Sequence, residues 1–308
     1  MTQVADRLAI IGVGLIGGSV ALALRRSGHV GEIIGCGRSE SNLKRAVELG
    51  VIDRYQLDPA EAVAGADMVL LAVPVGAMQA TMRTIAPALV EDSVVTDAGS
   101  TKCSVIEAAN STLGDHLARF VPGHPIAGTE SQGVDAAFAE LFQGRRVILT
   151  PTEATAEDAY QRCVALWETV GAVVSEMDAE HHDEVLGATS HLPHVLAFAL
   201  VDQLAAMQEK REIFEYSAGG FRDFTRIASS SPEMWRDIVH ANREALLPVL
   251  AGFGRKLEVL AQAIENDDMD TVMACFTRAK RTRDRLIGLA NAGKGSGAVD
   301  SVTRKPDA

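Results

Sequence analysis

Short apolar runs bounded by turn residues recur along the first part of the chain, and each has the length of a buried β-strand. These runs are Leu8–Ile11, Glu32–Cys36, Asp67–Val73, Ser93–Asp97, Arg146–Leu149 and Ala172–Val174. Segments with helical periodicity lie between them, for example the amphipathic segment Ala156–Val170. Because strands alternate with helices in this order, the pattern predicts a parallel, doubly wound sheet.

A glycine-rich turn follows the first apolar run and matches the pattern G-x-G-x-x-G. In such a turn the first glycine permits the bend, the second lets a pyrophosphate approach the backbone, and the third lets helix and strand pack closely. The helix that follows is expected to reach about Arg26, with Gly28 as its C-cap, and its amino terminus would bind phosphates. The predicted dinucleotide site comprises Gly12, Gly14, Leu15, Ile16 and Gly17, with Val73 and Pro74 at the end of a later strand.

The second apolar run determines which dinucleotide we expect. An NAD enzyme usually places a carboxylate at the end of this strand to bind the ribose 2′-hydroxyl, but Glu32 lies at its beginning. The end is occupied by Gly37, Arg38 and Ser39, and an arginine in this place favours a 2′-phosphate. We therefore favour NADP as the cofactor, with NAD as the alternative. Arg38 could instead stack on the adenine or point into solvent.

Beyond about Met177 the strand pattern fades and long helical stretches take its place, at Glu180–Met207, Ser231–Ala263 and Met269–Ala290. Ser231, Pro232 and Glu233 form a typical helix start. The expected fold is therefore an α/β Rossmann-type, doubly wound domain at 1–177, followed by an all-α domain at 178–292. We expect the remaining residues, 293–308, to form a disordered tail.

The composition narrows the function. The net charge of −12 argues against a nucleic-acid partner, which needs clustered basic residues. The nearly uncharged run Leu8–Leu24 could be misread as a membrane span, but its glycine spacing favours strand, turn and helix, so we expect no membrane partner. The four scattered cysteines are expected to be free thiols in the cytoplasm. The histidines between His181 and His194 lack accompanying cysteines or a carboxylate cluster, so no metal site is predicted.

Three segments carry candidate chemistry: Pro122–Glu130, Ser190–His194 and Gly219–Ala228. In the first segment, two prolines and two glycines surround His124 in what we expect to be a short loop, which suits a fixed catalytic base. From composition alone, however, a lone histidine is more often structural, and Arg222 and Arg226 could form surface ion pairs of little energetic value.

Taken with the glycine turn and Asp97–Ser100, these segments resemble the prephenate/arogenate (cyclohexadienyl) dehydrogenase family, in the family's order and over residues 8 to 290. The resemblance implies a Rossmann domain followed by a helical domain through which two copies dimerise. It also implies oxidative decarboxylation of prephenate to 4-hydroxyphenylpyruvate, or of arogenate to tyrosine, with hydride transfer to NAD(P). The choice between these substrates, and feedback inhibition by tyrosine, stay open.

The resemblance also implies roles for individual residues. His124 would take the proton of the substrate hydroxyl, and Ser100 would bond either His124 or the same hydroxyl. Arg226 would bind the ring carboxylate, because its planar guanidinium can bind a carboxylate through two hydrogen bonds. His194, with Arg222 nearby, would recognise the substrate side chain. Glu130 would gate or orient the pocket.

Two other functions compete with this one. A β-hydroxyacid or 6-phosphogluconate-type dehydrogenase shares the two-part architecture, but the stretch Glu180–Met207 contains no lysine to serve as its catalytic residue. A non-catalytic dinucleotide-sensing regulator could keep the fold without the chemistry. The joint presence of Ser100, His124 and Arg226 disfavours the regulator.

Overall fold

The computed structural model describes residues 3–129, 131–207 and 218–295, with side chains described as far as residue 285. The chain divides into two compact units, Met1–Val249 and Leu250–Ala308. The domain boundary expected near residue 177 falls inside the first unit and stays a prediction.

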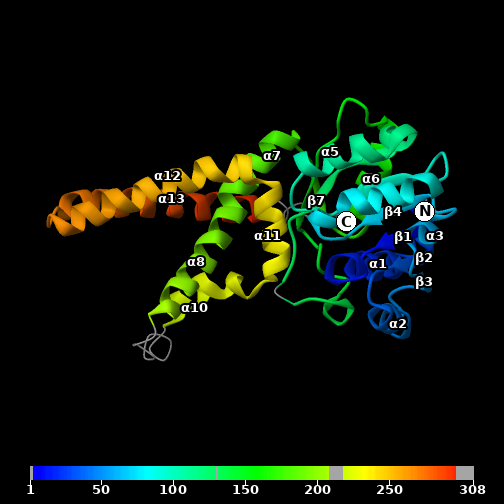
Figure 1. The fold of residues 1–308 in the computed structure, drawn as a ribbon, viewed down its shortest axis with the longest axis horizontal. Helices are drawn as coiled ribbons and strands as arrows, with labels where there is room; N and C mark the ends of the chain where they lie inside the picture. Colours follow the sequence, from blue (N-terminus) through cyan, green and yellow to red (C-terminus); the bar gives the residue numbers. More distant parts are fainter. Residues whose placement is uncertain (1–2, 130, 208–217, 296–308) are drawn as a thin grey trace, which may run out of the picture. The chain divides into compact units, whose positions relative to one another are not determined.

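A six-stranded parallel sheet forms the centre of the first unit, in the order β3-β2-β1-β4-β5-β6 (Figure 1). Its strands are β1 (Ala5–Ile11), β2 (Val30–Cys36), β3 (Arg54–Gln56), β4 (Met68–Leu71), β5 (Val94–Asp97) and β6 (Phe120–Val121). In register, Ile10 lies beside Gly35 of β2 and Leu70 of β4. The strand order reverses between β1 and β4, which is where such sheets bind ligands. The predicted Rossmann-type fold is confirmed.

Helices cover both faces of this sheet, which is why its strands read as continuous apolar runs. Leu8 and Ile10 of β1 join one core, whereas Ala9 and Ile11 of the same strand join the other. The helices on the two faces are α1 (Leu15–Ser27), α2 (Glu40–Glu48), α3 (Pro59–Val63), α4 (Met78–Ile85), α5 (Cys103–Thr112) and α6 (Glu157–Thr169). The 3-10 turns η1 (Val75–Ala77), η2 (Ala86–Ala88), η3 (Gly114–Arg119) and η4 (Val134–Ala136) complete this part.

A second sheet differs from the expectation. Strands β7 (Gly123–Pro125), β8 (Arg146–Leu149) and β9 (Val173–Glu176) form a separate three-stranded sheet in which β7 and β8 are antiparallel. The prediction that the runs at 146 and 172 extend the parallel sheet is therefore wrong. His124 lies in β7 opposite Ile148, not in a loop. A three-residue strand that ends at a proline is too short to produce a recognisable pattern.

The helical stretch expected at 180–207 is present but has a wide turn in its middle. Helix α7 (Ala179–Leu186) continues through the π-helical turn η5 (Gly187–His191) into α8 (Leu192–Ala206). Pro193 lacks an N–H group, and in a regular α-helix its ring would clash with the preceding turn, which accounts for the widening. Among the described residues, Ala179–Ala206 is the one helix long and apolar enough to cross a membrane by length and composition.

Further helices follow residue 218: α10 (Gly219–Thr225), the 3-10 turn η6 (Arg226–Ser229), α11 (Pro232–Ala241), α12 (Arg243–Glu265) and α13 (Met269–Gly295). The stretch expected at 231–263 is broken at Asn242. Ser231 accepts a hydrogen bond from the Met234 N–H, as its place before α11 predicts. Residues 293–295 belong to α13 and 296–308 lie outside the described residues, so the tail expected at 293–308 stays a prediction.

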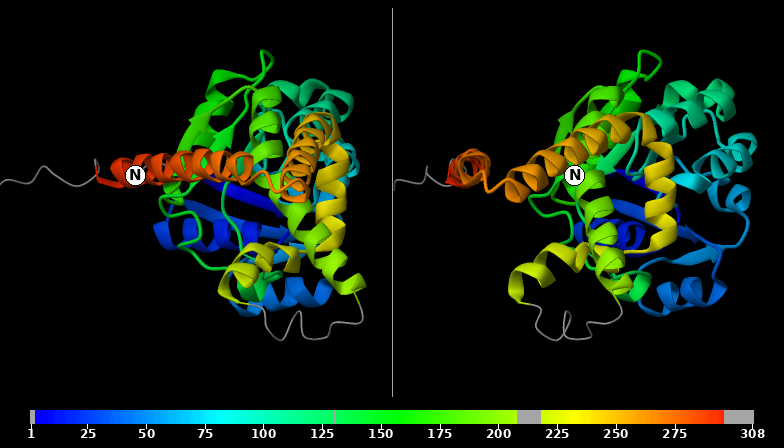
Figure 2. Two further views of the ribbon diagram at one scale, coloured as in Figure 1. Left: turned by 90° about the vertical axis from the view of Figure 1, so that its left-hand side faces the viewer. Right: turned by 60° about the vertical axis from the view of Figure 1, so that its left-hand side comes forward.

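Three packing contacts of these helices matter for the site. Helix α11 packs against η1, at the end of β4, and α8 packs against α10 and η6 (Figures 1 and 2). A Cβ atom on Gly76 would lie 2.5 Å from Asp237 of α11, so the approach is close. Helix α11 is thereby held beside the end of β4.

Candidate active site

The glycine turn between β1 and α1 contains two glycines that are closely packed and one that faces open space. A Cβ atom on Gly12 would lie 2.3 Å from the Ala72 carbonyl oxygen, and Gly12 adopts φ +106°. A Cβ atom on Gly17 would lie 2.3 Å from the Gly12 oxygen, whereas one on Gly14 would meet nothing within 4 Å. No side chain caps α1 and its first turn has no acidic residue. The turn therefore fits a pyrophosphate.

The end of β2 matches the expectation from the sequence. Glu32 lies at the opposite end of the strand, where it accepts hydrogen bonds from Arg7 (2.8 Å) and Arg54 (2.7 Å). Arg54 is the main cause of the lowered pKa of Glu32. Beyond the strand, the Arg38 side chain is exposed, and the Ser39 hydroxyl caps α2 by accepting a bond from the Asn42 N–H. Ser39 thus has a structural role in addition to the predicted one.

The loops after β1 and β4 meet at the predicted cofactor site. A Cβ atom on Gly12 would lie 3.2 Å from the backbone nitrogen of Val73, and Pro74 leads directly into η1. The Asn42 side chain donates to the Val13 carbonyl (2.7 Å), which ties the start of α2 to the glycine turn. The predicted cofactor-binding residues at the ends of β1, β2 and β4 therefore lie along one edge of the sheet.

A fully buried ion pair at the end of β5 was not predicted. The Lys102 Nζ donates to Asp97 Oδ2 (2.5 Å) and to the Gly123 carbonyl (2.6 Å). Asp97 Oδ1 in turn accepts a bond from the Gly123 N–H (3.0 Å). Burial lowers the pKa of Lys102, and the carboxylates of Asp97 and Asp183 oppose this change. The pair fixes β7, and with it His124, to the carboxyl end of β5.

His124 stands at the centre of the site, with 9% of its surface exposed. Its Nδ1 lies 2.8 Å from Nε2 of His182, and Nδ1 of His182 lies 2.8 Å from Oδ1 of Asp183. Burial, followed by electrostatic interaction with His182, Lys102 and His191, lowers the pKa of His124 well below 6.5. A buried, neutral imidazole at the edge of the sheet can act as a proton acceptor near neutral pH.

A second group of rings lies beside the first. The Asn242 side chain donates to Nδ1 of His191 (2.8 Å), and burial lowers the pKa of His191 to about 4. The Trp235 ring stacks on His194, with ring centroids 3.6 Å apart, and meets His191 edge-on at 6.0 Å. Nδ1 of His194 donates to the Ser190 carbonyl (2.9 Å), which leaves Nε2 for a ligand.

Ser100 is half-buried, and its backbone lies against His191. Nδ1 of His124 pairs with His182, so a bond from Ser100 would have to reach Nε2 instead. Arg222 lies in α10 and Arg226 begins η6, and both side chains are exposed on elements that pack against α8. Glu130 lies outside the described residues. The roles assigned to these residues stay predictions.

Sequence reasoning gave no indication of Lys102, Asp183 or Asn242; it pointed to Trp235 after the third candidate segment without assigning it a role, and to His182 only as a metal ligand. Asp97 ends a buried strand and Lys102 follows it after four small residues, so an opposite charge five positions away was a usable signal. The consecutive His182 and Asp183 at the start of a helix were a second one. Among the residues that the structure describes, no three histidines, cysteines or carboxylates could hold a metal ion together.

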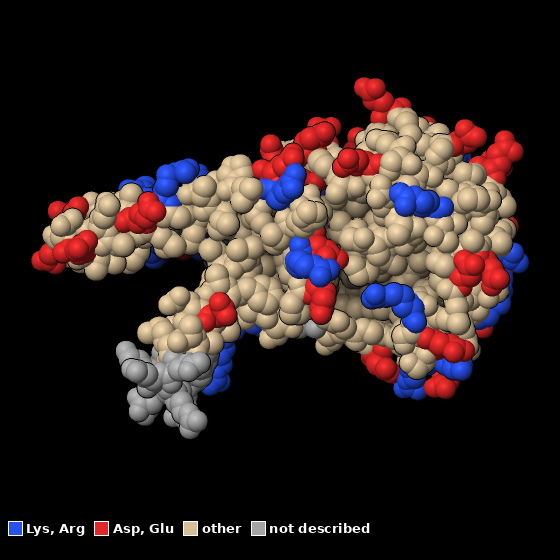
Figure 3. All heavy atoms as spheres, in the orientation of Figure 1, with Lys and Arg blue, Asp and Glu red and all other residues tan. Residues whose placement is uncertain are grey.

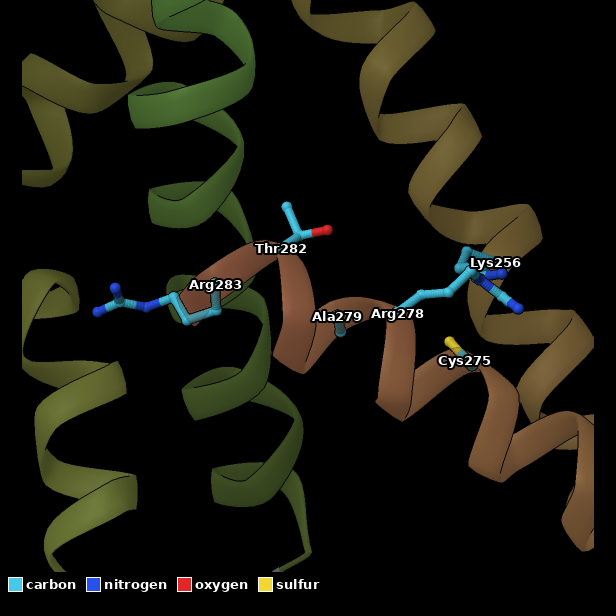
Figure 4. Close-up of a pocket in the computed structure, with 6 residues that line it drawn as sticks. All are labelled: Lys256, Cys275, Arg278, Ala279, Thr282 and Arg283. Atoms are coloured by element: carbon cyan, nitrogen blue, oxygen red, sulfur yellow. The ribbon is translucent and has the colours of Figure 1, made fainter. Parts of the chain in front are cut away.

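A cavity of about 410 Å³ in the second unit is separate from this chemistry. It lies between α12 and α13 and is lined by Lys256, Cys275, Arg278, Ala279, Thr282 and Arg283. Figure 4 shows Lys256, Arg278 and Cys275 close together, whereas Arg283 points away from them. None of these residues was a candidate for catalysis or cofactor binding.

The fold and the glycine turn define a dinucleotide-dependent dehydrogenase of the Rossmann type. Comparison with protein families agrees: the nucleotide-binding domain of prephenate dehydrogenase matches residues 20–176, and the dimerization domain of prephenate dehydrogenase matches residues 178–278. The chain belongs to the prephenate dehydrogenase family.

Individual relatives are similar over most of their length. The cyclohexadienyl dehydrogenase of Zymomonas mobilis is 44% identical over 90% of this chain and 94% of its own. The prephenate dehydrogenase of Bacillus subtilis is 36% identical over 93% of this chain and 77% of its own. A crystal structure of the A. aeolicus prephenate dehydrogenase with hydroxyphenyl propionate and NAD⁺ superposes with a TM-score of 0.84 at 39% identity, covering 91% of this chain and 98% of that one. The crystal structure of Synechocystis arogenate dehydrogenase superposes with a TM-score of 0.74 at 29% identity. The match covers 91% of this chain and 99% of that one.

Proposed function

We propose that this chain catalyses the oxidative decarboxylation of prephenate, of arogenate or of both, as a step of tyrosine biosynthesis. The observation that carries the proposal is His124, a buried imidazole with a lowered pKa whose Nδ1 is engaged by His182. It lies beside the end of β5, along the same edge as the glycine turn. The family membership supports the same reaction.

The chemistry divides between the chain and its cofactor. Bound nicotinamide dinucleotide supplies the hydride acceptor. His124 accepts the proton of the substrate's ring hydroxyl through Nε2 as that carbon becomes a carbonyl. The ring carboxylate leaves as carbon dioxide from the dienone, its bonding electrons enter the ring, and the phenolate so formed takes up a proton to become a phenol. Aromatisation supplies much of the driving force, so the chain's task is to position the substrate and hold the proton acceptor.

The substrate would be held by groups from the helical segment. Arg226 binds the ring carboxylate, and His194, stacked flat on Trp235, contacts the substrate side chain. Arg222 adds positive charge near that end, and Glu130 orients or gates the pocket. Ser100, beside His191, bonds the reacting hydroxyl. The packing of η6 and α10 on α8 supports this assignment, because it connects both arginines to the helix that carries His194.

For the cofactor, we propose NADP in preference to NAD. The support is the exposed Arg38 after β2 and the use of Glu32 in ion pairs at the other end of the strand. Arg38→Ala should raise the KM for NADP about tenfold or more and change the KM for NAD little, because only NADP carries the 2′-phosphate. Initial rates with each cofactor measure both constants. Equal effects on the two cofactors would make Arg38 an adenine-stacking residue instead.

We further propose that two copies of the chain form a homodimer through the helical region, and that the enzyme works in the cytoplasm with no nucleic-acid or membrane partner. The matched dimerization domain and the exposed apolar side chains of α12 and α13 support the dimer. The described cysteines are free thiols. On the face drawn in Figure 3, basic side chains are interspersed with acidic ones, which is unlike a surface for a phosphate backbone.

The direct test measures reduced cofactor by absorbance with prephenate or arogenate, each with NADP or NAD. Turnover of either substrate is the expected result, and the four pairings also rank the substrates and cofactors. A β-hydroxyacid serves as the control for the competing dehydrogenase class. Cofactor binding without turnover of any substrate would favour the sensing regulator and overturn the proposal.

A further inference from the structure

A buried chain of side chains runs behind His124 and ends on a carboxylate. The contacts are His124 Nδ1 to His182 Nε2 (2.8 Å) and His182 Nδ1 to Asp183 Oδ1 (2.8 Å). His182 is fully buried and Asp183 is 3% exposed. His124 and His182 come from β7 and from α7, and their rings meet edge-on at 5.1 Å. Neither His182 nor Asp183 takes a direct part in the proposed reaction.

We propose that His182 and Asp183 are positioning residues that fix the tautomer of His124, so that Nε2 is always the unprotonated nitrogen. This inference rests on the proposed function of His124 as the proton acceptor.

The hydrogen-bonding capacity of each atom in this chain of side chains fixes where the protons lie. An ionised carboxylate only accepts hydrogen bonds, so Asp183 requires a proton on Nδ1 of His182. A neutral His182 then has a lone pair on Nε2 and must accept, so Nδ1 of His124 must donate. The single proton of a neutral His124 is therefore on Nδ1. The lone pair needed to take a substrate proton is left on Nε2, facing away from His182.

Asp183 is held as an anion by backbone groups. Its Oδ1 accepts from the Lys102 N–H (2.8 Å) and its Oδ2 from the Cys103 N–H (3.0 Å), at the amino terminus of α5. Burial alone would raise the pKa of Asp183, but the bonds from His182 and these two N–H groups lower it. The Asn242 side chain also donates to the Asp183 carbonyl (2.8 Å). The carboxylate thus has a fixed position and a fixed charge.

The surroundings of His124 make its tautomer matter. The described titratable groups that act on it are His182, Lys102 and His191, and all three disfavour a second proton on the ring. The Lys102 ammonium is bound to Asp97 and to the Gly123 carbonyl, one residue before His124. Because the ring is neutral, it carries one proton, and only the hydrogen-bond network decides which nitrogen holds it.

Asp183→Asn is the first test. The asparagine amide can donate to Nδ1 of His182, which would reverse both tautomers and put the His124 proton on Nε2. We expect kcat to fall about 10²–10⁴-fold with little change in either KM. The exposed neighbour gives a matched control: His181→Asn, whose side chain is 60% exposed, should keep full activity.

A second pair of variants covers the case in which Asp183→Asn fails to fold, since its amide nitrogen cannot accept the bond from the Lys102 N–H. In His182→Gln the amide oxygen can still accept from Nδ1 of His124, whereas His182→Leu offers no acceptor. We expect the glutamine variant to keep at least about tenfold more of kcat than the leucine variant. Equal losses of kcat in the two variants would overturn the proposal.

The tautomer itself is read from the imidazole ¹⁵N shifts of His124 in the full-length protein, assigned by comparison with His124→Asn. We expect a protonated Nδ1 in the unaltered protein and a protonated Nε2 in Asp183→Asn. A protonated Nε2 in the unaltered protein would refute the inference. This measurement needs no turnover, so it is independent of the substrate assay, where absence of turnover would refute the proposed function alone.

Discussion

At the scale of single residues, the proposed chemistry depends on the His124 imidazole. In His124→Asn the amide can still bond His182, but it cannot take a proton from the substrate. We expect kcat to fall about 10²–10⁴-fold while substrate binding is largely kept. Steady-state kinetics, with the melting temperature as a check on folding, measures this. A variant that turns over at a near-normal rate would remove His124 as the base.

The environment of His124 also sets the acid limit of the reaction. Burial and three neighbouring cationic or imidazole groups lower its pKa well below 6.5. The base must be neutral to act, so activity is present above the lowered pKa and is lost as the pH falls through it. We therefore expect kcat/KM to be nearly unchanged between about pH 7 and pH 6. A decline centred at 6.5 would show that the ring titrates like an exposed histidine.

At the scale of elements, different glycines of the turn between β1 and α1 serve stability and cofactor binding. Gly14→Ala should change the free energy of unfolding by no more than about 0.5 kcal/mol, because the added Cβ meets open space. It should nevertheless weaken NADP binding about tenfold or more, because the Cβ would occupy the place of the pyrophosphate. Gly17→Ala, the matched control, should cost about 1–3 kcal/mol of stability, because its Cβ would lie 2.3 Å from the Gly12 oxygen. Denaturant unfolding and cofactor titration measure both. Undiminished binding by Gly14→Ala would contradict the assignment.

The elements also show what a sequence can and cannot reveal. The β1–turn–α1 unit was predictable because its pattern is local, with each glycine within a few residues of the atoms it must avoid. Strand β7 was not, since three residues carry no periodicity and its partner β8 begins more than twenty residues later. The resemblance identified His124, but it did not reveal what holds it.

The network behind His124 illustrates the same limit. His182 lies 58 positions from His124 along the chain, and Asp183 reaches back 81 positions to the Lys102 N–H. Neither contact follows from local spacing. A lone histidine between prolines and glycines is compatible with a structural role. Only the buried pairing with His182 and the charge on Asp183 define which ring nitrogen of His124 can accept a proton.

At the scale of the whole molecule, the site in the first unit draws on elements from one end of that unit to the other. The glycine turn precedes α1, whereas Asn242, which links Asp183 to His191, follows α11. The family's two matched domains meet between residues 176 and 178, so both contribute side chains to this network. This explains why the fold of the nucleotide-binding part alone would not define the reaction.

The second unit gives the last prediction, which concerns assembly. Helices α12 and α13 expose Met273 (67%), Phe276 (60%), Ile264 (62%) and Leu257 (51%), more apolar surface than a helical pair normally leaves to water. A second copy of the chain would cover such a surface, and burying each large side chain contributes about 1.5–3 kcal/mol. The double change Met273→Glu with Phe276→Glu should therefore raise the dimer Kd more than about 100-fold. Analytical ultracentrifugation measures this, with the exposed Leu57→Glu of the first unit (54% exposed) as control. A dimer unaffected by the double change would place the interface elsewhere.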